Sequence, residues 1–213
     1  MTTLEKIIQA KHRRIGIQKL SNSFTDHYIN NDSNVAGPKF FDSLIKSNNE
    51  YKIIAEMKKA SPSAGLFVED YKPDLIAQEY EKKGYTNLSI LTEEDHFHGL
   101  LSHITKVKKI SQLPILQKDF IVDEWQIYQA KTIGADCILL IAEVLTKEEI
   151  DSFIHIAKTL QLDVLLEFHD EGEIPKILDT NLRYIGINNR NLHTLETNAV
   201  SYTHLTLPTS LIV

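Results

Sequence analysis

Six short apolar runs recur along the chain after residue 51, and this recurrence constrains the fold more than any other feature. Longer stretches, in which apolar residues have helical spacing, separate the runs. The starts of the runs lie about 20 to 35 residues apart, which leaves room for one helix and two loops each time. The pattern therefore predicts a repeated βα unit with parallel strands. The predicted strands are residues 52–58, 87–92, 114–120, 137–143, 163–169 and 184–190.

Signals for helix ends support the segments between these strands. Residues 74–84 and 123–134 each end in glycine, the residue that most often follows a helix. Residues 146–160 begin with Thr146 and, three positions later, Glu149, which is the spacing of a capping box. These segments are predicted to be the helices that connect successive strands.

The chain before the repeats is predicted to begin with an amphipathic helix. Leu4, Ile7 and Ile15 fall near helical spacing behind a capping pair formed by Thr2 and Glu5. We therefore expect a helical extension that precedes the first βα unit.

Polar residues at the strand ends favour a closed barrel over a doubly wound open sheet. Lys58, Lys118, Glu167 and Asn188 each lie at the carboxyl end of a different predicted strand, where the active sites of βα barrels form. An open sheet more often concentrates its chemistry in a glycine-rich loop, and the sequence contains no such phosphate-binding pattern. The predicted fold class is α/β, a (β/α)8 TIM barrel with about six of its eight units in this chain.

Composition excludes several classes of protein. The net charge of -6 argues against nucleic acid as a partner, because binding to a phosphate backbone needs a basic face. The single cysteine, Cys137, lies in an apolar run and excludes an internal disulfide or a multi-cysteine metal site. No run approaches the roughly 18 apolar residues of a membrane span, and charges interrupt the N-terminus where a signal peptide would be apolar. We expect a cytoplasmic protein.

Charged residues on the strands suggest acid–base chemistry. Glu56 and Lys58 are two positions apart, so they share a strand face and could pair. Lys118 ends a buried strand, where partial desolvation could lower its pKa and make it a general acid. Glu167 is embedded in an apolar run, and a buried acid usually requires a partner.

Four segments together resemble the signature strands of indole-3-glycerol-phosphate synthase. They are I-A-E-x-K-x-x-S-P-S, L-x-K-D-F, L-L-E and I-G-I-N-x-R-x-L, at residues 54–63, 116–120, 165–167 and 185–192. The resemblance implies a lyase of tryptophan biosynthesis that closes the indole ring of 1-(2-carboxyphenylamino)-1-deoxyribulose 5-phosphate, with loss of carbon dioxide and water. It implies no metal and no organic cofactor.

The resemblance also implies roles for four charged residues. Lys118 would be the acid that protonates the substrate carbonyl, and Lys58 a second acid. Glu167 would be the base of the dehydration. Glu56 would orient a lysine and the anilino nitrogen.

Five further residues would bind the phosphorylated substrate. Asn188 would support the region of Glu167, Arg190 with Ser61 would hold the substrate carboxylate, and Phe97 and Phe120 would wall the aromatic ring. Neither a membrane nor a nucleic acid is expected as a partner, and association with another enzyme of the tryptophan pathway stays open.

The end of the chain departs from this pattern. We expect residues 1–50 to form the helical extension, residues 51–200 an incomplete barrel, and residues 201–213 a tail that does not match the fold. A complete barrel would need a further helix and two more βα units, roughly 50 residues. Because the loops after those last strands usually clamp the substrate phosphate, the chain as given is expected to be inactive.

Two alternative functions remain. One is a non-catalytic barrel remnant that binds a phosphate metabolite or a partner subunit. The other is a related barrel such as phosphoribosylanthranilate isomerase, which places a cysteine base at the end of its first strand. Here Glu56 and Lys58 occupy that end, and Cys137 begins the fourth strand, so the isomerase is disfavoured.

Overall fold

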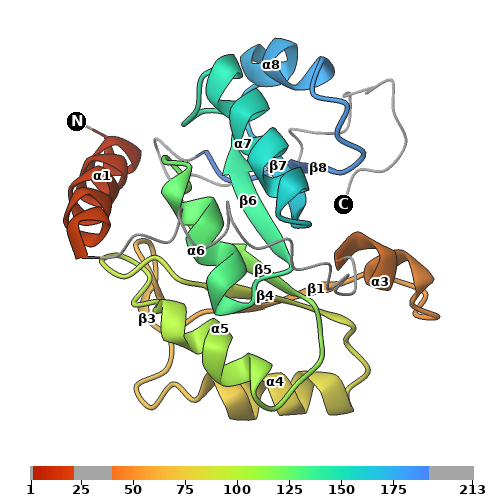
Figure 1. Cartoon of the computed structure of the whole chain (residues 1–213). Coiled ribbons are helices and arrows are strands. Elements are labelled where there is room, and N and C mark those ends of the chain that lie inside the picture. The colour runs from red at the N-terminus through yellow and green to blue at the C-terminus, as the bar shows by residue number, and fades with distance from the viewer. Residues whose placement is uncertain (1, 22–39, 192–213) are drawn as a thin grey trace.

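The computed structural model describes residues 2–21 and 40–191, and a single six-stranded parallel sheet forms its centre (Figure 1). Neighbouring strands follow one another in chain order, β1-β4-β5-β6-β7-β8. Each strand therefore returns through a helix to pair beside the previous strand, which is the connection of a βα barrel. The predicted βα repeat and the barrel-type fold class are confirmed.

All six predicted strands are present, each somewhat shorter than its apolar run. Every pair of neighbouring strands in this sheet is parallel. The strands are β1 (Ile54–Met57), β4 (Asn87–Leu91), β5 (Ile115–Lys118), β6 (Cys137–Ile141), β7 (Asp163–Phe168) and β8 (Ile185–Ile187).

Both faces of the sheet are apolar, as expected for strands covered on two sides. On β6, Ile138 and Leu140 belong to the larger core cluster, under the surrounding helices. Cys137, Leu139 and Ile141 alternate with them and belong to a second cluster, on the inner face. The period of two residues along the strand therefore separates the outer core from the barrel interior.

The connecting helices end where the sequence indicates. They are α4 (Pro73–Lys82), α5 (Leu101–Lys108), α6 (Trp125–Ile133), α7 (Lys147–Thr159) and α8 (Ile174–Leu178), the last preceded by the 3-10 turn η1 (Glu171–Glu173). Gly134 ends α6 with a φ of 90°, a left-handed conformation that glycine adopts without steric cost. At the start of α7, the Thr146 hydroxyl accepts from the Glu149 backbone N–H, and the Glu149 carboxylate accepts from the Thr146 N–H. The predicted capping box is confirmed.

Two helices outside the repeat cover opposite ends of the sheet. The predicted N-terminal helix is α1 (Thr3–Ser21), and its Thr2–Glu5 capping pair is formed. Its Leu4 and Ile7 belong to the inner cluster. Helix α3 (Phe40–Lys46) lies at the amino ends of the strands, where the Phe40 carbonyl accepts from the Asn87 side chain.

A small hairpin follows β1 and is not predicted by the sequence pattern. Strands β2 (Ala60–Ser61) and β3 (Gly65–Leu66) pair antiparallel, and Gly65 has a φ of 70°. The division into residues 1–50, 51–200 and 201–213 stays a prediction, because the proposed tail lies outside the described residues.

Candidate active site

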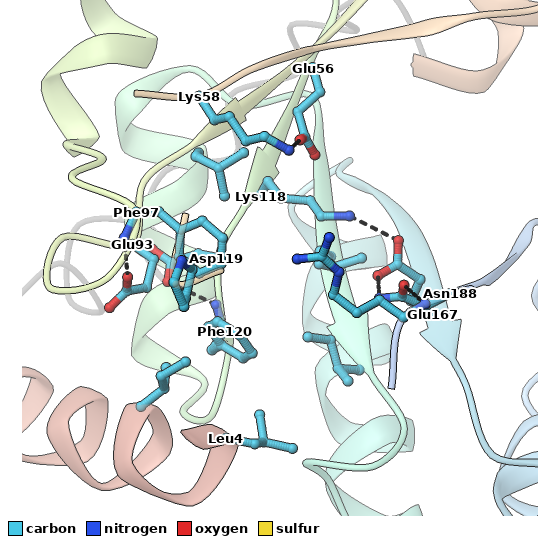
Figure 2. Close-up of a pocket in the computed structure, with 16 residues that line it drawn as sticks. Leu4, Glu56, Lys58, Glu93, Phe97, Lys118, Asp119, Phe120, Glu167 and Asn188 are labelled. Atoms are coloured by element: carbon cyan, nitrogen blue, oxygen red, sulfur yellow. Dashed lines mark hydrogen bonds and ion pairs between the residues drawn. The ribbon is translucent and has the colours of Figure 1, made fainter. Parts of the chain in front are cut away.

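A cavity of about 270 Å³ opens at the carboxyl ends of the strands (Figure 2). Residues from the ends of all six strands and from α1 surround it. Every site residue predicted from the sequence except Ser61 lines this cavity. The lining residues are Leu4, Ile7, Glu56, Lys58, Pro62, Leu91, Glu93, Phe97, Lys118, Asp119, Phe120, Leu139, Ile141, Glu167, Asn188 and Arg190.

The end of β1 contributes one ion pair to the cavity. The Lys58 ammonium lies 2.6 Å from a carboxylate oxygen of Glu56, so the predicted pairing is confirmed. Both side chains are about one-third exposed, at 38% and 35%. The Lys58 ammonium also lies 5.7 Å from the centre of the Phe67 ring, within the range of a cation–π interaction. Both charged groups of this pair line the cavity.

A second ion pair joins β5 to β7 across β6. The Lys118 ammonium lies 2.9 Å from Glu167 Oε1, and these side chains are only 24% and 14% exposed. Both residues share the inner face of the sheet with Leu116 and Leu165, which precede them by two positions. The strand period therefore turns both charged groups toward the cavity.

The pKa of Lys118 is raised, whereas the sequence suggested that burial would lower it. Burial lowers the pKa of this ammonium, as expected, but the charge and hydrogen bond of Glu167 and the charge of Glu56 raise it by more. The net pKa lies above the ordinary value. Lys118 is therefore a protonated group at neutral pH, because its partner outweighs desolvation.

The end of β8 supports Glu167 from the other side. The Asn188 amide nitrogen lies 3.4 Å from Glu167 Oε2, and the Asn188 side-chain oxygen accepts from the Arg190 backbone N–H at 2.9 Å. The Arg190 guanidinium donates to the Ser63 hydroxyl at 2.8 Å. Ser61 is instead buried in the hairpin, where its hydroxyl accepts from the Ala64 N–H. The serine beside Arg190 is Ser63, two positions beyond the predicted one.

The two predicted aromatic residues form one wall of the cavity. The ring centres of Phe97 and Phe120 lie 6.5 Å apart, with their planes inclined at 44°. Glu93, for which the sequence suggested no role, holds this wall in place. Its carboxylate accepts from the backbone N–H groups of Asp95, His96 and Phe97 at 2.8 to 3.2 Å.

Two more contributions to the site were missed by sequence reasoning. Leu4 and Ile7 of α1 lie on the cavity wall, although the amphipathic pattern alone could not say which surface they cover. Asp119 lines the cavity and is 5% exposed, and its position after a buried strand was the signal for it. Glu93 lies two positions after the end of β4, so an acid within two positions of the end of a buried strand marks both residues.

Other kinds of site receive no support in the part of the chain that the structure describes. No group of three or more His, Cys, Asp or Glu side chains there could hold a metal ion. No described helix is long and apolar enough to cross a membrane. Cys137 is fully buried at the amino end of β6 and is not among the residues that line the cavity, and burial raises the pKa of its thiol. A cysteine base of the isomerase type is absent from this site.

Comparisons with known proteins converge on one family. The sequence model described as indole-3-glycerol phosphate synthase matches residues 4–210. The indole-3-glycerol phosphate synthase of Lachnoclostridium phytofermentans is 40% identical over 199 residues, which cover 92% of this chain and 73% of that protein.

Two further relatives carry the same description. That of Acetivibrio thermocellus is 46% identical over 159 residues, which cover 75% of this chain and 61% of the relative. That of Campylobacter fetus subsp. fetus is 46% identical over 178 residues, which cover 84% and 66%. The chain thus matches about two thirds of the length of these proteins.

Proposed function

The chain belongs to the indole-3-glycerol phosphate synthase family, and we propose that it carries the acid–base site of this activity. The reaction is the decarboxylating and dehydrating ring closure of 1-(2-carboxyphenylamino)-1-deoxyribulose 5-phosphate to indole-3-glycerol phosphate. The observation that carries the proposal is the Lys118–Glu167 pair, an acid and a base 2.9 Å apart at the edge of a largely apolar cavity.

Lys118 is the proton donor of the ring closure. The ring carbon that bears the carboxylate attacks the substrate carbonyl carbon, and a proton must reach the carbonyl oxygen as this carbon–carbon bond forms. The raised pKa of Lys118 supports this role, because the ammonium carries its proton at neutral pH. Lys58, on the next strand but one, is the second acid.

Glu167 is the base of the dehydration. After the carbon–carboxylate bond breaks and carbon dioxide leaves, the new hydroxyl group departs as water when an acid protonates it and a base removes a proton from the substrate. A carboxylate that is 14% exposed and bonded to Lys118 and Asn188 is held in one orientation for that step. Glu56 orients Lys58 through their 2.6 Å ion pair.

The remaining cavity residues suit the aromatic acid end of the substrate. Phe97 and Phe120 offer ring faces and edges, with which an anilino ring packs favourably. Arg190 provides a guanidinium whose planar donors match a carboxylate. Its present partner is the neutral Ser63 hydroxyl, which a charged substrate group can replace.

We propose three further properties of the chain. The 213 residues alone turn over poorly, because no described lining residue forms the backbone phosphate clamp that barrels usually place after their seventh and eighth strands. The protein works in the cytoplasm. Any association with another enzyme of the tryptophan pathway uses surfaces outside the cavity.

The test compares residues 1–213 with a completed chain, in which the last two βα units of a relative follow residue 200. Product is measured by the fluorescence of indole-3-glycerol phosphate. We expect turnover in the completed chain and at least a tenfold loss in the 213 residues, since phosphate binding helps to position the reacting ring.

Two results would contradict these proposals. A completed chain that binds the substrate without forming product would favour the non-catalytic barrel. Turnover of the 213 residues within tenfold of the completed chain would refute the statement about the phosphate clamp.

A further inference from the structure

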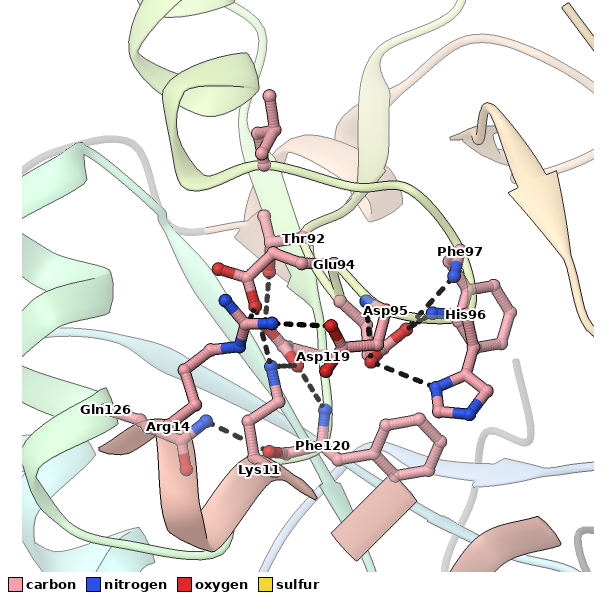
Figure 3. Close-up of polar contacts among 12 residues, drawn as sticks. Lys11, Arg14, Thr92, Glu94, Asp95, His96, Phe97, Asp119, Phe120 and Gln126 are labelled. Atoms are coloured by element: carbon pink, nitrogen blue, oxygen red, sulfur yellow. Dashed lines mark hydrogen bonds and ion pairs between the residues drawn. The ribbon is translucent and has the colours of Figure 1, made fainter. Parts of the chain in front are cut away.

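Helix α1 meets the barrel through a polar network at the ends of β4 and β5 (Figure 3). At its centre is Lys11, which is only 6% exposed. The Lys11 ammonium lies 2.7 Å from Asp119 Oδ1 and 3.7 Å from Glu94 Oε2. A buried lysine needs such partners, because removal of its charge from water is costly.

Asp119 joins the helix to both strand ends. Its Oδ1 accepts from Lys11 and from the Phe120 backbone N–H at 2.8 Å. Its Oδ2 accepts from the Thr92 hydroxyl at 2.6 Å, and the Gln117 side chain donates to that same hydroxyl at 3.2 Å. The Asp119 carboxylate is therefore satisfied on both oxygens, and the loops after β4 and β5 are tied to one point.

The position of Asp119 in the chain links this network to the candidate active site. Asp119 lies between Lys118, the proposed proton donor, and Phe120, part of the aromatic wall. A rotation of the backbone at Asp119 would move both neighbours. The carboxylate is held mainly by one cation, Lys11, whose charge stays at neutral pH because Asp119, Glu94 and Glu93 raise its pKa by more than burial lowers it.

An outer layer of the network strengthens the same contact. The Arg14 guanidinium lies 3.1 Å from Glu94 Oε2 and 2.5 Å from Asp95 Oδ1. Arg14 is more exposed than Lys11, at 36% of its side chain. Water screens this outer layer more than the inner pair, so Lys11 is the residue that fixes Asp119.

We propose that Lys11 is a positioning residue, which acts through its buried ion pair with Asp119 to hold Lys118 and Phe120 in place against Glu167. The proposal rests on the proposed function for its kinetic effect. It makes α1 part of the catalytic apparatus, beyond its role as an apolar cover through Leu4 and Ile7.

The kinetic experiment replaces Lys11 by Met in the completed chain, with Lys19→Met as the matched control. Lys19 lies on the same helix and pairs with Asp123 at 2.7 Å, but these side chains are 42% and 25% exposed and lie away from the cavity. We expect Lys11→Met to lower kcat about tenfold with KM changed less than threefold, as for a misoriented acid. The control should stay within twofold of the unaltered chain.

The fluorescence of Trp125 separates loss of positioning from detachment of the helix. Trp125 is the only tryptophan of the sequence, is 3% exposed, and clusters with Ile15 of α1. We expect its emission to be the same in Lys11→Met and in the control. A red shift in Lys11→Met would overturn the proposal, because the kinetic loss would then come from undocking of α1.

Hydrogen exchange tests the proposal without turnover, in the 213 residues as they stand. Exchange in residues 117–122 should rise about tenfold in Lys11→Met and stay unchanged in Lys19→Met, whereas β6 and β7 should keep their protection in both. The double variant Lys11→Met/Asp119→Asn should recover part of that protection, because no buried charge is left unpaired. Equal exchange in the two single variants, or a kcat of Lys11→Met within twofold of the control, would overturn the proposal. Absence of turnover in the unaltered completed chain would count against the proposed function, and exchange would then decide the role of Lys11.

Discussion

The Lys118 ammonium and the Glu167 carboxylate lie 2.9 Å apart although their strands are separated by β6. Between them on the inner face stand the apolar side chains Leu139 and Ile141. The charge and hydrogen bond of Glu167 therefore keep Lys118 protonated, although burial alone would favour its neutral form. The same ion pair positions both the acid and the base of the proposed reaction.

Replacement of Lys118 by Ala should lower kcat of the completed chain about 10²-fold or more, with a smaller effect on KM, as expected when a general acid is lost. Lys108→Ala is the matched control. Lys108 pairs with Asp136 at 2.6 Å, and the exposures of that pair, 24% and 14%, equal those of Lys118 and Glu167. Lys108 lies outside the cavity. An unchanged kcat in Lys118→Ala would remove Lys118 from the mechanism.

Replacement of Glu167 by Gln keeps the shape of the side chain and removes the base, so kcat should fall more than substrate binding. Asp136→Asn is the corresponding control. The variant should also shift the pH dependence, because burial, which lowers the pKa of Lys118, then loses its main opposition. The alkaline limb of any residual activity should move to lower pH. Weaker binding with intact turnover would contradict the role of base.

His103 should make stability depend on pH in the acidic range. Burial, followed by the charges of Lys106 and Lys59, lowers the pKa of this imidazole from 6.5 to about 4. The unfolded chain therefore binds a proton between these values that the folded chain does not. The contribution of His103 to the free energy of unfolding is therefore fully present above pH 6.5 and is lost as the pH falls toward 4.

Denaturant titrations at pH 7 and pH 5 measure this contribution. The loss due to His103, which is 6% exposed, should be about 2 kcal/mol over that interval. Between pH 7 and pH 5, the His103→Gln variant should therefore lose less stability than the unaltered chain, and the difference should equal this contribution. The exposed His155 provides the control, and His155→Gln should keep the original slope. Equal slopes in all three proteins would show that His103 titrates normally.

Ser63 and Ser61 should differ in what their replacement changes. Ser63→Ala removes the partner of the Arg190 guanidinium and should change KM about threefold, with the melting temperature unaltered. Ser61→Ala removes the acceptor of the Ala64 N–H in the buried turn and should lower stability by about 1 kcal/mol. Thermal melts and substrate titrations on the pair distinguish these effects. A larger KM effect at Ser61 would restore the sequence-based assignment.

The sequence was sufficient for the fold and for the strand-end residues because both follow from local patterns. Runs such as residues 137–143 have the length and composition of buried strands, and parallel connection brings their carboxyl ends together. The pairing of Glu56 with Lys58 follows from a spacing of two on one strand.

Relationships between distant segments could not be read in this way. The pKa of Lys118 depends on how closely Glu167 approaches across β6, and no local pattern contains that distance. The choice of Ser63 over Ser61 depends on the turn of the β2–β3 hairpin, which is too short to have a periodicity. The contact of Lys11 with Asp119 joins residues more than a hundred positions apart.

The burial of Cys137 gives the protein an internal reporter of opening. Its side chain has no exposed surface, and burial holds the thiol in its protonated, unreactive form. A thiol reagent can reach it only after β6 separates from the strands beside it, since those strands pack around the residue. The rate of alkylation of this one sulfur therefore measures how often the centre of the sheet comes apart, with no label added to the chain.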